Sequence, residues 1–304
     1  SILKFAQALD AEGLKVGLIT NDQGDRLVDT TVAHANGFPV EEIAGGCFCC
    51  RFNSLRDAAD KLTAEARPDV FLAEPVGSCT DLVATVSYPL RRIYGDRFSV
   101  APLSVVIDPA RAARIFGLTE SSHFSEKVTY VYRKQLEEAD LIVVNKCDAS
   151  PPEMLDRVVL SINENFPHAK TFVCSAKYGT NLEPWFKSLL SEEVLASRSL
   201  EINYDTYAEG EALLGWLNCT VSLKTDQPFD GNRSLLALVD DIRNRVVNQG
   251  GRIAHLKATL ESHDGSGTLS VVSLVENNDE PDLRESLLDY VNGGSLVVNL
   301  RAEA

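Results

Sequence analysis

Basic residues are scarce in this sequence of 304 residues, with 29 Lys and Arg against 44 Asp and Glu and a net charge of −15. Such an acidic chain is repelled by phosphate backbones and anionic lipids, which argues against nucleic-acid and membrane binding. No apolar run approaches the roughly 20 residues that cross a bilayer, and no signal peptide is recognisable. The seven cysteines are odd in number and clustered, unlike a secreted disulfide framework. We therefore expect a soluble cytoplasmic protein.

Alternating strands and helices dominate residues 1–190. Several expected strands, such as Leu141 to Val144, consist almost entirely of Val, Ile and Leu. This pattern predicts an α/β domain with a mostly parallel sheet and helices on both faces. Residues 191–211 are expected to be an acidic, irregular linker. Residues 212–304 follow the order βαββαβ, with helices expected at 234–248 and 282–291, which predicts a smaller ferredoxin-like α+β domain.

Three cysteines, Cys47, Cys49 and Cys50, fall within four positions directly after two glycines. Thiolates are soft ligands that suit Zn²⁺ and similar ions, and glycine permits the curved backbone that would turn these sulfurs to one side. Two other interpretations stay open. The thiols can be buried packing residues beside Phe48, or they can carry thiol redox chemistry at Cys49 and Cys50.

Two loops at expected strand ends can recognise a guanine base. Asp148 can accept hydrogen bonds from the guanine N1–H and N2 amino groups, Asn145 can hold neighbouring loops, and the Lys146 stem can cover the ring. At the end of the following strand, the run Ser175-Ala176-Lys177 can bring a backbone N–H to the base oxygen and a second lysine stem to the ring. Either loop alone is also compatible with an ordinary turn.

Acidic and glycine residues at two earlier strand ends suit Mg²⁺ and phosphate. Glu74 can hold the water shell of Mg²⁺, and Gly77 can let its backbone approach a terminal phosphate. Asp22 and Gln23 can supply a second contact to the metal or position the attacking water. A carboxylate beside a loop glycine is common, so this pair carries weight only together with the other motifs.

Taken in order, these motifs resemble the CobW-like P-loop GTPases, relatives of the HypB and UreG nickel chaperones. The resemblance covers residues 1–190 and rests on Asn21 to Gly24, Gly46 to Cys50, Glu74 to Gly77, Gln135 to Asp140 and Asn145 to Asp148. It implies a P-loop NTPase-like fold and GTP hydrolysis to GDP with Mg²⁺. It also implies that the cysteines hold Zn²⁺ or Co²⁺ and that the nucleotide state controls metal release.

The phosphate-binding loop of such proteins, Gly-x-x-x-x-Gly-Lys-Ser/Thr, is absent from this sequence. A helix over residues 2–12 without a preceding strand is an unusual start for an α/β domain. We expect the chain to begin just past the loop, with Ser1 as its last hydroxyl residue or the next one. Without the loop, affinity for a nucleoside triphosphate is expected to be poor.

Two functions remain open at this point. The first is a GTP-hydrolysing metallochaperone that serves a client metalloenzyme or a cobalamin- or corrinoid-related protein. The second is a nucleotide-regulated adaptor or activator of such an enzyme that delivers no metal. A homodimer is compatible with both. His34 and Cys79 are weaker candidates for a further metal ligand.

Overall fold

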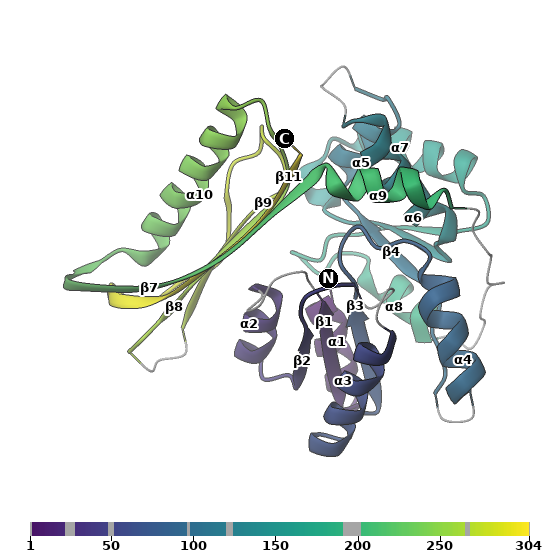
Figure 1. Cartoon of the computed structure of the whole chain (residues 1–304), viewed down its shortest axis with the longest axis horizontal. Helices are drawn as coiled ribbons and strands as arrows, with labels where there is room; N and C mark the ends of the chain where they lie inside the picture. The colour runs from purple at the N-terminus through teal and green to yellow at the C-terminus, as the bar shows by residue number, and fades with distance from the viewer. Residues whose placement is uncertain are drawn as a thin grey trace. The chain divides into compact units, whose positions relative to one another are not determined.

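The structure is a computed structural model that describes residues 2–21, 28–47, 52–95, 98–119, 124–190, 202–264 and 268–303 (Figure 1). The chain divides into two compact units. The first comprises Ser1–Gly13, Phe48–Phe52 and Gly77–Glu211, and the second comprises Leu14–Cys47, Asn53–Val76 and Ala212–Ala304. The boundaries predicted from the sequence, 1–190, 191–211 and 212–304, remain a prediction.

A three-stranded parallel sheet forms the centre of the first unit. Its order is β4-β5-β6, with the bounds Ser104–Ile107, Leu141–Val144 and Lys170–Val173. All four side chains of the central strand β5 are buried. A strand buried on both faces must be apolar at every position, which explains its continuous Leu-Ile-Val-Val run.

Helices cover both faces of this sheet. On one face, Ile142 and Val144 pack in a cluster with α5, α6 and α7, which span Pro109–Ile115, Glu126–Glu138 and Pro152–Asn165. On the other face, Trp185 of α8 (Leu182–Leu190) packs against Leu141 and Val143. Phe5 of α1 (Ile2–Ala11) stacks on Phe186 of α8 with ring centroids 4.6 Å apart. The predicted parallel sheet with helices on both faces is confirmed.

The sequence predicts a helix over roughly residues 80–93 that Pro89 should end or kink. The helix opens as a wide turn, η1 (Val83–Ser87), in which hydrogen bonds span five residues, and continues as α4 (Tyr88–Tyr94). Pro89 has no N–H to donate and its ring collides with the preceding turn of a regular helix. A wide turn directly before the proline relieves that collision.

A second three-stranded parallel sheet lies in the second unit. Its order is β2-β1-β3, with the bounds Val40–Ile43, Val16–Asn21 and Val70–Glu74. Asn21 is paired with Ile43, and Thr20 with Glu74. All three strands therefore end at one edge of the sheet. Helices α2 (Val28–Ala35) and α3 (Phe52–Glu65) follow β1 and β2.

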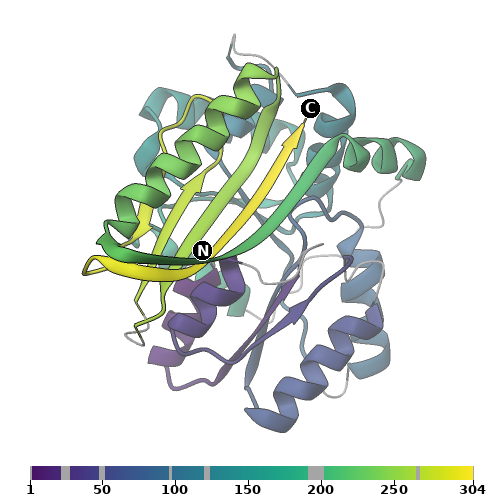
Figure 2. The same cartoon turned by 60° about the vertical axis from the view of Figure 1, so that its left-hand side comes forward.

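The C-terminal region forms a five-stranded antiparallel sheet. Its order is β10-β9-β8-β11-β7, with the bounds Asp282–Glu285, Leu269–Leu274, Arg252–Ser262, Val291–Glu303 and Leu214–Phe229. Helix α10 (Gly231–Asn248) lies across one face, where Leu235 and Val239 pack against strand residues (Figure 2). Its N-terminus is capped by Asp230, whose carboxylate accepts the Arg233 N–H at 3.0 Å.

The prediction of a helix over residues 282–291 is wrong. This range holds the short strand β10, which pairs with β9, so the region has the order βαββββ instead of βαββαβ. The apolar residues at 283, 287 and 288 have helical spacing, which explains the prediction. Tertiary contacts favour an extended conformation here instead. The Asn232 side chain donates to the Leu287 carbonyl and accepts the Leu287 N–H, both at 2.9 Å. Those bonds replace the ones a helix would supply.

Part of the acidic stretch 191–211 is also ordered differently from the prediction of irregular chain. Residues Tyr204–Ala212 form helix α9. Within the portion of the chain that the structure describes, no helix is both long and apolar enough to cross a membrane.

Candidate functional site

Asn145 ties together the two loops that were predicted to read a base. Its backbone N–H donates to the Ile107 carbonyl at 2.9 Å, which extends the β4–β5 pairing by one residue. Its side-chain Oδ1 accepts the Ala176 N–H at 2.9 Å. The loops after β5 and β6 are thus held at a fixed separation, which a rigid planar ligand between them requires.

Lys146 is held in place by a residue that the sequence interpretation missed. Lys146 adopts the left-handed backbone conformation with φ of 66°, and its ammonium lies 2.9 Å from the Asp108 carboxylate. Asp108 also caps α5 by accepting the N–H groups of Ala110 and Arg111 at 3.0 and 3.1 Å. Asp108 directly follows the apolar run at the end of β4 and precedes Pro109, and that position is the signal that could have identified it.

The charge state of this pair follows from its surroundings. Burial alone would raise the pKa of Asp108, but the Lys146 charge and hydrogen bond, together with the Arg111 N–H, outweigh it and hold the pKa below its ordinary value. Asp108 is therefore an anion at neutral pH, and it fixes the lysine stem beside the loop. A stem held in this way can lie flat on a ring.

Asp148 presents its carboxylate at the same edge. It lies in the short turn η2 (Cys147–Ala149), and its side chain is exposed. The turn is fixed to the end of β6, because the Cys147 N–H donates to the Cys174 carbonyl at 3.1 Å. An exposed carboxylate on an anchored turn can accept two donors from an incoming guanine edge.

The Ser175-Ala176-Lys177 loop is a tight turn. Ser175 and Thr180 exchange two backbone hydrogen bonds of 3.0 Å, and Gly179 has a φ of 73°. Ser175 is only 1% exposed and its hydroxyl accepts the Tyr178 N–H at 3.3 Å, whereas Lys177 is exposed. The structure thus brings all six predicted base-reading residues to one edge of one sheet.

The second unit places Cys47 and Glu74 along one edge of the β2-β1-β3 sheet. Glu74 ends β3, and Cys47 lies in the loop after β2. Both strands flank β1, so their axes are about 10 Å apart. Gly45 and Gly46 have φ values of 76° and 145°, the curved backbone that the sequence predicts before the cysteines.

Asn21, at the end of the central strand β1, holds this cysteine loop. Its side-chain amide donates to the carbonyls of Ile43 and Gly46, both at 2.8 Å, and it is 8% exposed. The next residue in the chain is Asp22, a predicted Mg²⁺-side or water-positioning residue. A direct hydrogen bond therefore joins the strand that leads to Asp22 with the residue before Cys47.

Several predicted site residues lie outside the described part of the chain: Ser1, Asp22, Gln23, Cys49 and Cys50. Among the residues that are described, no three His, Cys, Asp or Glu side chains form a group that could hold a metal. The predicted site requires Cys49 and Cys50 beside Cys47, so it stays a prediction. Gly77 lies in the loop after β3, three residues past the end of the strand at Glu74.

The cysteines that the structure describes differ in chemical state. Cys47 and Cys79 are each disulfide-bonded, which puts another sulfur beside each of them. Cys147 and Cys174 are free thiols near the base-reading loops. Burial raises the pKa of both, that of Cys174 to about 11, so neither supplies a thiolate at neutral pH. A packing role therefore fits both.

Glu138, at the end of α6, is expected to make stability depend on pH. Burial raises its pKa to about 7, although N–H groups of Val83 and Leu82 partly offset this. Because the folded pKa exceeds the unfolded one, the stabilisation is complete below about pH 4.5 and is lost as the pH rises through about 7. In the wild type, the free energy of unfolding should fall by about 2 kcal/mol as the pH rises from 5 to 8. We expect Glu138→Gln, which keeps a hydrogen-bond acceptor but cannot ionise, to abolish this fall.

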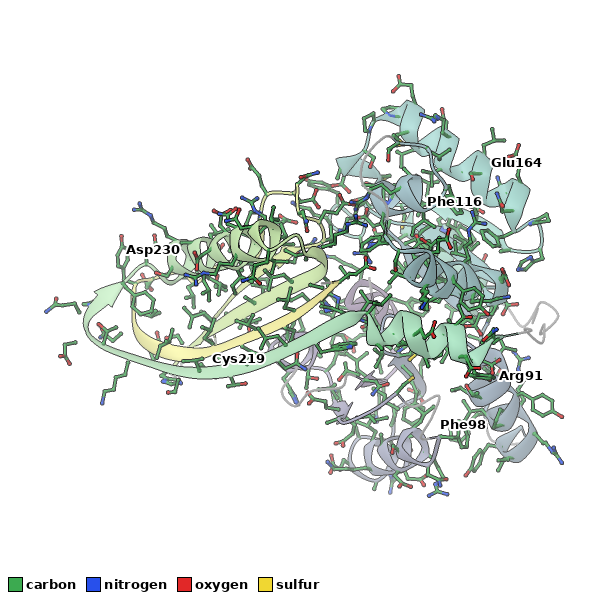
Figure 3. The ribbon with its side chains drawn as sticks, turned by 45° about the horizontal axis from the view of Figure 1, so that its top comes forward. Arg91, Phe98, Phe116, Glu164, Cys219 and Asp230 are labelled. Atoms are coloured by element: carbon green, nitrogen blue, oxygen red, sulfur yellow. The ribbon has the colours of Figure 1, made fainter. Side chains whose placement is uncertain are left out.

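Urea unfolding of the wild type and of Glu138→Gln between pH 5 and pH 8 measures this change in the free energy of unfolding. Glu164→Gln is the control, because Glu164 is an exposed glutamate on α7 (Figure 3). The control should follow the wild type across the range. Parallel curves for the wild type and Glu138→Gln would contradict the prediction.

Comparison with known proteins assigns the chain to a family. The CobW/HypB/UreG nucleotide-binding domain matches residues 2–173. The zinc chaperone YeiR of Escherichia coli (strain K12) is 29% identical over 143 residues, which is 46% of this chain and 40% of that protein. The zinc chaperone CobW of Sinorhizobium sp is 27% identical over 161 residues, 46% of this chain and 45% of that protein. Each match thus spans less than half the length of the relative.

A solved structure, HypB from Helicobacter pylori in complex with nickel, is 16% identical, with a TM-score of 0.45 over 66% of this chain and 85% of that one. A likeness of that size carries no argument about function. The family match, in contrast, covers more than half of the sequence and includes both loops at the ends of β1 and β5. The chain belongs to the CobW/HypB/UreG nucleotide-binding domain family.

Proposed function

We propose that this protein is a GTP-binding and GTP-hydrolysing metallochaperone that holds Zn²⁺ or Co²⁺ through Cys47, Cys49 and Cys50. Membership of the nucleotide-binding family supports the first half of the proposal. Two relatives named zinc chaperones support the second half. The observation that carries the proposal is the pair of hydrogen bonds from Asn21, one to Ile43 at the end of β2 and one to Gly46 in the loop that leads into Cys47.

The loops after β5 and β6 would hold the guanine base. Asp148 accepts the two donors of the guanine edge, Asn145 sets the distance between the loops, and the Lys146 and Lys177 stems cover the ring faces. Ser175 and Ala176 would fix the loop beside the base, because their N–H groups donate to the Thr180 carbonyl and the Asn145 side-chain oxygen. The charge-assisted hydrogen bonds, which contribute most to affinity, would thus come from Asp148 in the anchored turn η2.

Mg²⁺ and the phosphates would be held by the other motifs. Glu74 orders the water shell of Mg²⁺, Gly77 lets backbone approach the terminal phosphate, and Ser1 contributes near the metal. Asp22 and Gln23 position the attacking water. Hydrolysis then requires little covalent work from the protein, since positioning and charge stabilisation account for most of phosphoryl-transfer catalysis.

Coupling between nucleotide and metal follows from Asn21. A change in the β1 end when the γ-phosphate leaves would move the Asn21 amide and, through it, the Gly46 carbonyl. The geometry of a thiolate site is sensitive to such a shift, because tetrahedral coordination allows little freedom. The released metal would pass to a client metalloenzyme or a cobalamin- or corrinoid-related protein in the cytoplasm, from a monomer or a homodimer.

Zn²⁺ and Co²⁺ affinities of the full-length protein, measured with a non-hydrolysable GTP analogue and again with GDP, test the coupling. We expect about a tenfold difference between the two states, equivalent to ~1.4 kcal/mol of coupling. Asn21→Ala should bring the two affinities together while GTP turnover persists. Equal affinities in the wild type would contradict the coupling.

Metal analysis of the purified wild type beside Cys49→Ala, together with a GTPase assay, tests the function itself. A metal-loaded wild type, a metal-free variant and GTP turnover in both would support the proposal. Metal-free wild type whose GTP turnover is accelerated by one client protein would favour the adaptor function instead.

A further inference from the structure

The loop after β3 is held by the helix α6 in the first unit. The Gln135 side-chain amide donates to the carbonyls of Gly77 and Cys79 at 3.0 and 2.9 Å. The Glu138 carboxylate, one turn further along α6, accepts the Val83 N–H at 3.3 Å. Both ends of the segment from Gly77 to Val83 are therefore attached to one helix, and only the residues between them need another support.

Helix α9, which is distant in the sequence, supplies that support. The Ser78 hydroxyl donates to Glu211 at 2.7 Å, across 133 positions of the chain. The Tyr204 hydroxyl donates to the Asp81 carboxylate at 2.6 Å. Ser78 is 4% exposed, so its contact with Glu211 is shielded from competing water. Asp81 has a φ of 62°, a left-handed conformation that is uncommon for residues other than glycine, although aspartate tolerates it better than most.

Helix α9 is itself fixed on α6. Lys127 and Glu209 form an ion pair of 2.6 Å, and the N–H of Asn203, just before α9, donates to the Tyr130 hydroxyl at 2.8 Å. A Cβ at Gly210 would lie 2.7 Å from the Lys127 carbonyl oxygen, so only glycine allows the two helices to approach this closely. The helices α6 and α9 thus form one frame around the loop.

We propose that α9 is a clamp on the loop from Gly77 to Asp81 and that Glu211 and Tyr204 are positioning residues for GTP hydrolysis. The inference rests on the proposed function, in which Gly77 approaches the terminal phosphate. Glu211 and Tyr204 touch neither nucleotide nor Mg²⁺; they act by holding Ser78 and Asp81, which fixes the backbone on the far side of Gly77. A looser loop would bind GTP nearly as well but would spend less time in the reactive geometry.

The clamp also has a consequence for the C-terminal sheet. Strand β7 begins at Leu214, two residues after α9 ends at Ala212. A shift of the loop that pulls on Ser78 and Asp81 would be carried through α9 into the start of β7. The clamp therefore gives the nucleotide state a covalent route to the region that follows.

Steady-state GTP hydrolysis by the full-length variants tests the clamp. We expect Glu211→Ala to lower kcat about tenfold, or about 1.4 kcal/mol of transition-state stabilisation, with KM and the dissociation constant for GTP changed less than about twofold. Glu211→Gln, whose amide oxygen still accepts from Ser78, should retain most of the wild-type kcat. Tyr204→Phe should lower kcat about threefold, and the control Tyr290→Phe, at an exposed tyrosine, should not.

The outcomes separate the clamp from the proposed function. A wild type that hydrolyses GTP, beside Glu211→Ala and Tyr204→Phe variants with unchanged kcat, would overturn the clamp alone. A loss of GTP affinity equal to the loss of kcat would also overturn it, because that result indicates general damage to the fold. A wild type that neither binds nor hydrolyses GTP would overturn both. A double-mutant cycle between Ser78→Ala and Glu211→Ala should show that the two kcat effects do not add.

Discussion

Replacing Cys47 with serine is expected to weaken Zn²⁺ binding by at least about a hundredfold, or ~2.7 kcal/mol. A serine hydroxyl stays protonated at neutral pH, so the substitution removes a charged soft ligand and leaves the others in place. The apparent binding free energy of a small zinc site, about 10–16 kcal/mol, is shared among four ligands, so one ligand contributes about 2.5–4 kcal/mol, a range that includes the expected loss. Competition with a chromophoric chelator measures the change.

The experiment must be done under a thiol-free reductant, because Cys47 is disulfide-bonded in this structure and only a thiolate binds the metal. Cys219→Ser is the matched control. Cys219 is an exposed free thiol on β7 and is far in sequence from the Cys-x-Cys-Cys run (Figure 3). The control should bind Zn²⁺ as the wild type does. Equal affinities for Cys47→Ser and the wild type would remove Cys47 from the proposed ligand set.

The elements that sequence predicts well are those in which every residue gives the same signal. Strand β5 has four buried apolar side chains and was predicted with the observed bounds. The range 282–291 fails for the opposite reason. Its apolar spacing is helical, but its conformation is decided by hydrogen bonds to Asn232, which lies 55 positions away from Leu287. Local patterns carry no information about such a partner.

The same distinction applies to the candidate site. The base-reading residues were predictable, because each directly follows a strand and strand ends of a parallel sheet meet at one edge. The residues that hold them in place were not. Asp108 contacts Lys146 across 38 positions, and Asn21 contacts Gly46 across 25. Both are polar residues at strand ends, so their positions were visible in the sequence, but their partners were not.

Helix α9 is the extreme case. Its sequence is acidic and has no apolar face, since Gly210 is its only buried residue, and residues 191–211 were therefore expected to be irregular. Polar contacts to Ser78 and Asp81, and the close approach allowed by Gly210, hold the helix in place instead. Helices with polar contact surfaces are poorly visible to methods based on hydrophobic periodicity.

The largest effect on nucleotide recognition is expected from Asp148→Asn. The carboxylate of Asp148 would accept hydrogen bonds from both the N1–H and the N2 amino group of guanine. The asparagine amide has only one acceptor oxygen, and its NH₂ group would face one of the two guanine donors without forming a hydrogen bond. Two hydrogen bonds to a charged group contribute about 1.5–3 kcal/mol each, so GTP affinity should fall by at least about a hundredfold. Xanthine carries a carbonyl oxygen in place of the guanine amino group, and this oxygen can accept from the asparagine. The variant should therefore prefer XTP.

Titration of fluorescent GTP and XTP analogues into the full-length variants measures both changes. Asp156→Asn serves as the control, because it removes the same charge from an exposed aspartate on the next helix, α7. The control should keep the wild-type preference for GTP, which would exclude a general effect of lower negative charge. If Asp148→Asn lost affinity for both nucleotides in equal measure, Asp148 would support the loop and not read the base. The gain of XTP binding is the stronger result, because damage to the fold cannot produce it.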